Sequence, residues 1–303
     1  MTDTTTTNAF YLDKQQVRAA FDRAAATYDE IAVLQREVGE RMLERLELVK
    51  IEPSYIADIG AGTGRCSAAL AKRYRHSQVI ALDIAPGMLA EARRRDTLMT
   101  RWFGHKHYLC GDAEALPLAD HSVDLVFSNL TVQWCNDLDQ TLREFQRVLK
   151  PGGLLMFTTL GPDTLKELRH SWMHSDGYNH VNAFYDMHDI GDALVRARMT
   201  TPVMDVEHFT LTYPDVMHLM RDLKAIGGHN VTAGRAHGLT GPRRLKAMTA
   251  AYEQFRRDGL LPATYEVVYG HTWAPEISAN RPAPGGDVQI PVTQIGRRQQ
   301  KQF

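Results

Sequence analysis

The stretch Asp58-Ile59-Gly60-Ala61-Gly62-Thr63-Gly64 decides the fold of this 303-residue chain. It follows an apolar run, Tyr55–Ile59, that predicts a strand, and it precedes Arg65–Tyr74, which predicts a helix. A chain leaving a strand here must turn sharply and let a ligand approach its backbone, which glycine permits because it has no Cβ. The dinucleotide-binding pattern needs a glycine where this sequence has Arg65. The acid two residues before the first glycine suits a cationic ligand group better than a pyrophosphate.

Strand and helix patterns alternate on both sides of this stretch. Helices are predicted within residues 14–50, where apolar residues recur at helical spacing. Further strands are predicted at Val79–Asp83, His107–Cys110, Val123–Ser128 and Leu154–Thr159, and further helices at Pro86–Arg95 and Asp137–Leu149. Lys150-Pro151-Gly152-Gly153 predicts a tight turn into the last of these strands. Such alternation indicates an α/β fold with a doubly wound parallel sheet covered by helices on both faces.

The second half of the chain has a different pattern. Val203–Tyr213 and Tyr265–Trp273 predict two more strands, separated by about fifty residues that predict two helices. This is too long for a plain connection, so we expect a helical cap at about 214–262. The whole domain is expected to span 11–275. Residues 1–10 predict a disordered N-terminus and residues 276–303 predict a mobile tail.

Composition narrows the class of protein. The 35 Lys and Arg nearly balance the 36 Asp and Glu, which argues against a nucleic-acid binder. The three cysteines, Cys66, Cys110 and Cys135, lack paired spacing, so we expect no disulfide framework, no metal site and a reducing compartment. No apolar run approaches the roughly 20 residues of a membrane span, and Met1–Asn8 does not resemble a signal peptide. These features predict a cytoplasmic protein without membrane contact.

Polar residues stand at the ends of four predicted strands, where ligands of open α/β sheets bind. Asp58 can face an amino group, and Asp83 can accept hydrogen bonds from two ribose hydroxyls. Asp112 follows the third strand and can accept a hydrogen bond from an adenine amino group. Asn129 and Gln133 follow the fourth strand. The four strand ends together predict a site for a nucleoside that carries an amino-acid group.

Over about residues 14–160, these motifs resemble the class I S-adenosylmethionine-dependent methyltransferases. The resemblance implies a Rossmann-like seven-stranded sheet whose last two strands form an antiparallel hairpin edge, with the predicted cap inserted between them. It also implies S-adenosylmethionine as the cofactor, held by residues at the strand ends. Those residues are Asp58, Gly60, Gly62, Gly64, Asp83, Ile84, Asp112, Ala113, Asn129 and Gln133.

Longer stretches carry a narrower resemblance, which extends to about Pro275. Residues 17–29, 128–134, 221–230, 241–245 and 268–273 resemble the malonyl-acyl-carrier-protein O-methyltransferase family of biotin synthesis. The resemblance implies esterification of the free carboxylate of a malonyl thioester. Masking that charge allows fatty-acid enzymes with apolar pockets to elongate the chain to pimeloyl length.

Several residues in these stretches are candidates for substrate binding. Arg221 and Lys224 are one turn apart on a predicted helix, so they share a face that can hold the malonyl carboxylate. Tyr28 stands where a helix ends and can cover the cofactor or contact the substrate. Acyl carrier proteins are acidic, so a basic patch beside the cap is expected to steer the carrier. The patch consists of Arg235, Arg243, Arg244 and Lys246.

Three other functions remain open at the level of sequence. A mitochondrial assembly factor that hydroxylates an arginine has a similar fold and a similar Asp-Leu-Lys stretch. A quinone-ring C-methyltransferase has a comparable N-terminal helix but would not need the long cap. A cofactor-binding module without catalysis is disfavoured by the dense set of polar strand ends.

Overall fold

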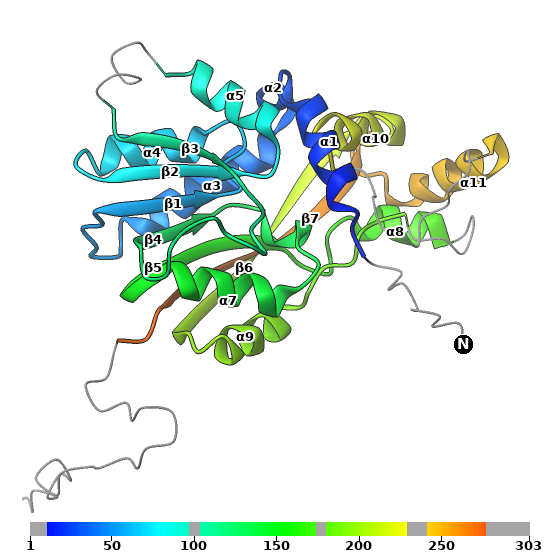
Figure 1. Ribbon diagram of the computed structural model, residues 1–303. Coiled ribbons are helices and arrows are strands. Elements are labelled where there is room, and N and C mark those ends of the chain that lie inside the picture. Colours follow the sequence, from blue (N-terminus) through cyan, green and yellow to red (C-terminus); the bar gives the residue numbers. More distant parts are fainter. Residues whose placement is uncertain (1–10, 97–103, 174–179, 229–240, 277–303) are drawn as a thin grey trace, which may run out of the picture.

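The computed structural model describes residues 11–96, 104–173, 180–228 and 241–276 (Figure 1). The segments predicted to be a disordered N-terminus and, apart from Glu276, a mobile tail lie outside the described residues, as does Arg235. Seven strands form one sheet in the order β3-β2-β1-β4-β5-β7-β6. They are β1 (Tyr55–Ile59), β2 (Gln78–Asp83), β3 (Lys106–Cys110), β4 (Val123–Ser128), β5 (Leu149–Leu160), β6 (Thr200–Tyr213) and β7 (Leu261–Trp273).

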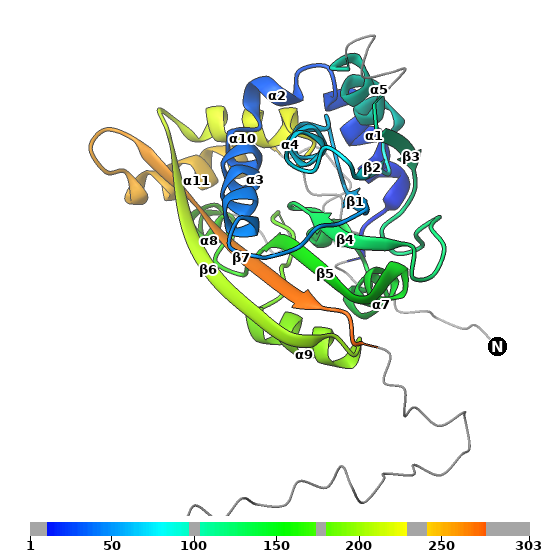
Figure 2. The ribbon, with the colours of Figure 1, turned by 90° about the vertical axis from the view of Figure 1, so that its left-hand side faces the viewer.

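Helices cover both faces of the sheet, as the alternating pattern predicts (Figure 2). One face packs against α3 (Val33–Leu46), α4 (Arg65–Arg73) and α8 (Lys166–Met173), and the other against α7 (Leu138–Val148) and α9 (Met187–Arg196). Neighbouring strand residues alternate between the two cores, because successive side chains of a strand point to opposite faces. On β5, for example, Leu154 and Met156 enter the first core, whereas Leu155 and Phe157 enter the second.

The last two strands form the antiparallel end of the sheet. β7 pairs antiparallel with β5 on one side and with β6 on the other. Between β6 and β7 the chain forms α10 (Val216–Ala225), α11 (Pro242–Tyr252) and the short 3-10 helix η2 (Glu253–Phe255). The predicted class of sheet and the helical cap inserted between its last strands are therefore confirmed.

Two local predictions differ from the structure. Residues 14–50 form α1 (Lys14–Ala24), α3 and, between them, the four-residue helix α2 (Tyr28–Ile31), which the apolar periodicity did not reveal. The predicted turn at Lys150–Gly153 lies inside β5. The pairing there shifts from Val123↔Leu149 to Leu125↔Leu154, and Gly152 takes a φ of +72°. The chain therefore turns without leaving the sheet.

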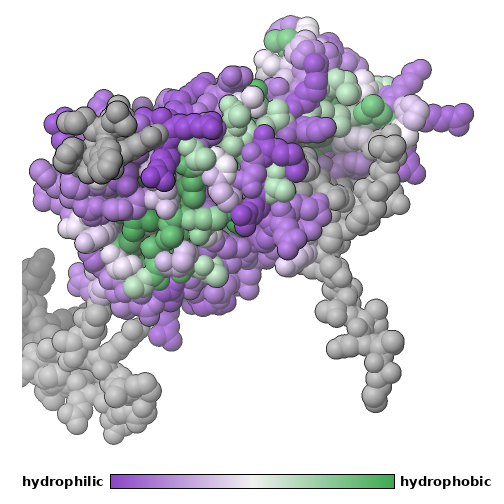
Figure 3. Space-filling view, turned by 45° about the horizontal axis from the view of Figure 1, so that its top comes forward, coloured by the Kyte–Doolittle hydropathy of each residue, from purple (hydrophilic) through white to green (hydrophobic). Residues whose placement is uncertain are grey.

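The remaining elements complete the parallel half. α5 (Pro86–Arg94) follows β2, and the 3-10 helix η1 (Val132–Trp134) follows β4. Within the described ranges, no helix is both long enough and apolar enough to cross a bilayer. On the face drawn in Figure 3, hydrophilic residues predominate and hydrophobic residues gather in a band across its middle.

Candidate active site

The glycine loop between β1 and α4 bends through left-handed backbone conformations. Gly60, Gly62 and Gly64 have φ values of +73°, +53° and +77°, which residues with a Cβ adopt only at a cost. A Cβ at Gly60 would overlap the Thr131 side chain, and one at Gly64 would lie 2.7 Å from the Cβ of Ala92. A Cβ at Gly62 would meet nothing within 4 Å. Gly62 therefore faces open space, whereas Gly60 and Gly64 are needed for close packing.

Two buried carboxylates stand beside this loop. Asp83 at the end of β2 accepts hydrogen bonds from the backbone N–H groups of Gly62 and Ala85, both at 2.8 Å. Asp58 on β1 accepts one from Ser67 Oγ at 2.5 Å, and its Oδ1 is buried without a hydrogen-bond partner in the described structure. Burial raises the pKa of Asp58 to about 7 and that of Asp83 to about 6. An unpaired buried carboxylate oxygen of this kind fits a cationic ligand group.

The ends of β3 and β4 complete this edge of the sheet. Asp112 Oδ1 accepts hydrogen bonds from Lys14 Nζ at 2.9 Å and from the Glu114 backbone at 3.1 Å. The amide of Asn129 is held between the carbonyl of Gln35 and the hydroxyl of Thr158. These bonds leave Asn129 less capacity for a ligand than the sequence suggested. Gln133 is engaged in the same way, by the carbonyl of Leu130 and the hydroxyl of Thr159.

A cavity of about 510 Å³ runs along these strand ends. Its wall includes most of the predicted cofactor residues: Gly60, Gly62, Asp83, Ile84, Asp112, Ala113, Asn129 and Gln133. An adjoining hollow of about 350 Å³ is lined by Asp58 and shares Tyr28, Gly60 and Gly62 with the cavity. Gly64 lines neither space, because it begins α4 and packs on Ala92. The structure gives Gly64 a packing role, and its contact with the cofactor stays a prediction.

The short helix α2 lies against the glycine loop. Tyr28 lines both spaces, and burial raises the pKa of its phenol above the usual range, with the charge of Asp83 adding to the rise. The neighbouring Asp29 accepts a hydrogen bond from Thr63 Oγ1 at 2.7 Å and forms an ion pair with Arg95 at the end of α5. These contacts fasten α2 to the loop, so Tyr28 is held over the cavity.

Part of the cavity has an apolar wall that the sequence analysis did not identify. Leu165, Leu168 and Trp172 contribute one side, and Tyr265 on β7 contributes another. The spacing of the first three by three and four residues was a signal that one helix face is apolar. Asn182, also on the wall, is buried, and its Oδ1 has no partner in the described part of the chain.

The predicted substrate pair is divided by the structure. Lys224 lines the cavity, but Arg221 does not. Arg221 is exposed on α10, and its Nε donates to the carbonyl of Met217 at 3.2 Å. The two residues share a helix face, as predicted, but that face meets the cavity only at its Lys224 edge. The other basic residues predicted beside the cap, Arg243, Arg244 and Lys246, are exposed on α11 and do not line the cavity.

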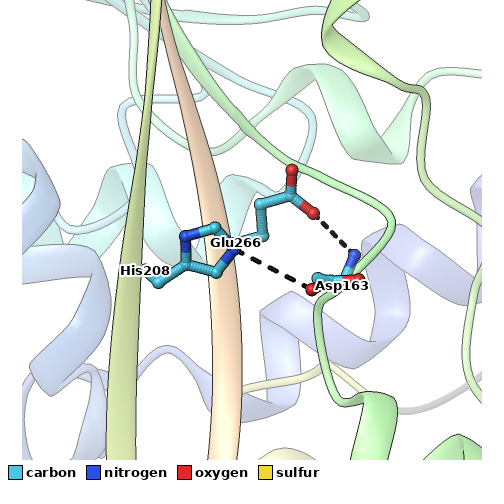
Figure 4. Close-up of side chains that lie close together, drawn as sticks. All are labelled: Asp163, His208 and Glu266. Atoms are coloured by element: carbon cyan, nitrogen blue, oxygen red, sulfur yellow. Dashed lines mark hydrogen bonds and ion pairs between the residues drawn. The ribbon is translucent and has the colours of Figure 1, made fainter.

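Outside the cavity, Asp163, His208 and Glu266 lie close enough together to suggest a metal site (Figure 4). Their atoms have other partners, however. Glu266 accepts a hydrogen bond from the Asp163 backbone at 2.6 Å, and Asp163 Oδ2 pairs with Lys166 at 2.8 Å and lies 3.9 Å from His208 Nε2. We therefore assign the group a structural role: it fastens β6 and β7 to the segment that follows β5.

A glycine loop beside an unpaired buried acid, on a sheet with an antiparallel β7, defines a class I S-adenosylmethionine-dependent methyltransferase. Residues 57–157 match the family described as "Methyltransferase domain". The fold is also similar to the crystal structure of the YcgJ protein from Bacillus subtilis. The two share 16% identity and a TM-score of 0.54, over 80% of this chain and 99% of that one.

Curated relatives narrow the class. A malonyl-[acyl-carrier protein] O-methyltransferase of Methylovorus sp. is 60% identical over 287 residues, which are 94% of this chain and 97% of the relative. One of Gallionella capsiferriformans is 56% identical over 276 residues, or 90% and 95% of the two chains. The chain belongs to the malonyl-[acyl-carrier protein] O-methyltransferase family. It is an S-adenosylmethionine-dependent O-methyltransferase.

Proposed function

We propose that the protein methylates the free carboxylate of a malonyl thioester carried on an acyl carrier protein. The product would be the malonyl methyl ester that starts pimeloyl synthesis for biotin. The main support for the proposal is the 60% identity to a malonyl-[acyl-carrier protein] O-methyltransferase over 94% of this chain, which includes the cap. The names of the relatives favour this activity over an arginine hydroxylase or a quinone C-methyltransferase. The proposal includes a cytoplasmic location, consistent with three unpaired cysteines.

The described residues fit the cofactor. When bound, S-adenosylmethionine supplies an electrophilic methyl group on a sulfonium. The unpaired Oδ1 of Asp58 would accept from the ammonium of its methionine part, and Asp83 would accept from its ribose hydroxyls. Asp112 and Ala113 would face the adenine, and Gly62 leaves room for the ligand. Tyr28, held over the cavity by α2, would shield this end from water.

A carboxylate acceptor needs orientation rather than a base, because it is already ionised near pH 7. The raised pKa of Tyr28 keeps its phenol neutral, which suits a hydrogen-bond donor to substrate and not a base. Among the described residues of the cap, Lys224 is the cation that lines the cavity, so we propose that it pairs with the malonyl carboxylate. The apolar wall of Leu165, Leu168 and Trp172 would enclose the thioester arm and exclude water from the reacting groups.

Replacing Lys224 with alanine tests its proposed role. We expect the KM for malonyl-pantetheine to rise about tenfold or more, because one charge-assisted hydrogen bond is lost. Arg221→Ala is the matched comparison, since Arg221 lies one turn away and outside the cavity. Steady-state kinetics on both variants provide the measurement, with cofactor affinity unchanged. The reverse order of effects would transfer the carboxylate contact to Arg221.

The activity itself is tested by mass spectrometry of the carrier protein. Purified protein is incubated with S-adenosylmethionine and either malonyl-carrier or acetyl-carrier protein. We expect one added methyl group on the malonyl form and none on the acetyl form, which lacks the free carboxylate. If protein that binds S-adenosylmethionine leaves the malonyl form unchanged, the proposed acceptor is wrong.

The carrier protein would meet basic residues of the enzyme. Arg243, Arg244 and Lys246 on α11 remain a predicted contact, because they are exposed and of the required charge. They do not line the cavity, however, and the residues at the cavity opening identify a second basic surface.

A further inference from the structure

The opening of the cavity can be located from exposure. Most of the described residues that line the cavity are buried or half-buried, and the two that are exposed are Arg23 and Lys224. Residues that line a cavity and also face solvent mark the place where it reaches the surface. Both are cations, and they stand on different helices, α1 and α10. The mouth of the cavity is therefore positively charged on two sides.

A third cation lies beside them. Arg221 is exposed on α10 one turn before Lys224. Its Nε donates to the carbonyl of Met217, and no carboxylate of the described residues forms an ion pair with it. The side chains of Arg23 and Lys224 form no hydrogen bond or ion pair with any other described residue. Uncompensated charges at an opening favour an anionic partner. Arg23, Arg221 and Lys224 are called the mouth cations below.

The acidic residues on the same two helices interact with groups away from the mouth cations. Asp22 on α1 accepts a hydrogen bond from the Gly87 backbone and lies 3.9 Å from the Arg18 guanidinium. Asp222 on α10 lies near Tyr213 of β6, where burial chiefly and the Asp222 charge in addition raise the pKa of the Tyr213 phenol. The Asp22 carboxylate is thus partly used in holding α1 to α5, and the Asp222 charge faces β6. On α1 and α10 together, lysine and arginine residues outnumber aspartates.

The two helices form one continuous rim. Gly227, at the end of α10, approaches α1 so closely that an added Cβ would lie 3.2 Å from Phe21 Cδ1. Phe21, like Leu223 on α10, also lines the cavity. The mouth cations therefore flank a single opening rather than two separate patches.

We propose that the acyl carrier protein docks on this rim, with its acidic surface against the mouth cations. The inference rests on the proposed function: a carrier-bound malonyl group must enter the cavity while the carrier itself stays outside. The carrier must then sit where the cavity opens, which the structure places between α1 and α10. The basic residues of α11 do not line the cavity, so they form at most an outer extension of this surface.

Charge reversal on each helix tests the docking surface. For Arg23→Glu and Arg221→Glu, we expect kcat/KM for malonyl-carrier protein to fall on the order of tenfold relative to kcat/KM for malonyl-pantetheine, which has no protein to dock. Arg143→Glu on α7, an exposed cation on the opposite side of the sheet, is the matched control and should leave this ratio unchanged. The ratio for the unmodified enzyme should also fall as salt is added.

Each other outcome has a distinct meaning. A loss with Arg243→Glu and Arg244→Glu, but not with the mouth variants, would move the carrier to α11 and overturn the inference. An equal loss with malonyl-coenzyme A would show that the cations bind phosphates rather than a protein, which also overturns it. If the unmodified enzyme methylates neither malonyl-carrier protein nor malonyl-pantetheine, the proposed function fails, a result that the mouth variants cannot imitate.

Discussion

Replacing Gly60 with alanine is expected to weaken binding of S-adenosylmethionine by about a hundredfold or more. The new Cβ costs about 1–2 kcal/mol in the left-handed backbone region. It would also overlap the Thr131 side chain, whose hydroxyl donates to the carbonyl of Ile59 at 3.1 Å. Relief of that overlap must shift the glycine loop. The shift would also move the N–H of Gly62, which donates a hydrogen bond to Asp83. Calorimetric titration with the cofactor measures the loss.

Gly259 provides the matched control for this change. Its φ of +80° imposes the same backbone cost on alanine, but an added Cβ there meets nothing within 4 Å. Gly259→Ala should therefore bind the cofactor normally. Adding Thr131→Ala to Gly60→Ala should restore part of the affinity, because two of the overlapping atoms are removed. If Gly60→Ala binds as well as Gly259→Ala, the packing argument is wrong.

Replacing Asp58 with asparagine is expected to change stability and cofactor affinity in opposite directions. The pKa of Asp58, about 7, lies above its value of 3.8 in an unfolded chain. Between these two pH values, the native state therefore binds a proton that the unfolded chain has lost. The unfolding free energy therefore falls as pH rises through this window, and removing the carboxylate should stabilise the free protein at pH 8. Thermal unfolding without cofactor measures this part.

The affinity of the Asp58 variant for S-adenosylmethionine, in contrast, should fall. A cationic ligand needs the ionised carboxylate, so binding to the unmodified protein must weaken as pH falls below about 7. Asp58→Asn should bind S-adenosylmethionine about tenfold to a hundredfold more weakly at pH 8, and with a flatter pH dependence. Asp124→Asn is the control, because Asp124 accepts backbone hydrogen bonds at the opposite end of β1, from Ser54 and Tyr55. Undiminished affinity in the Asp58 variant would remove it from the cofactor site.

The parallel half of the fold could be predicted because each strand carries its own local signals. β1 and β4 begin and end where their apolar runs do, bounded by glycine or a polar residue. The cofactor edge was also predictable, since topology brings the ends of parallel strands together whatever the exact register. Asp83 and Asp112 reached the cavity for that reason.

The substrate side was less predictable because it depends on how separate segments pack. Helical spacing placed Arg221 beside Lys224, but not the angle at which α10 meets the cavity. The hydrogen bonds that engage Asn129 come from Gln35 and Thr158, far away in the sequence. The four residues of α2 are too few to show a period, and the helix is held by Thr63 and Arg95 instead.

The placement of β7 inside the sheet has a consequence for biosynthesis. Within the part of the chain that the structure describes, β6 pairs with β7 alone, so it cannot join the sheet until the ribosome has released residues 261–273. Until then, the fourteen-residue β6 offers an unpaired edge while the cap helices are being made. The parallel half can fold first, but closure must wait for the last strand. A chain interrupted before Leu261 would therefore keep the cofactor loop and lose two strands at once.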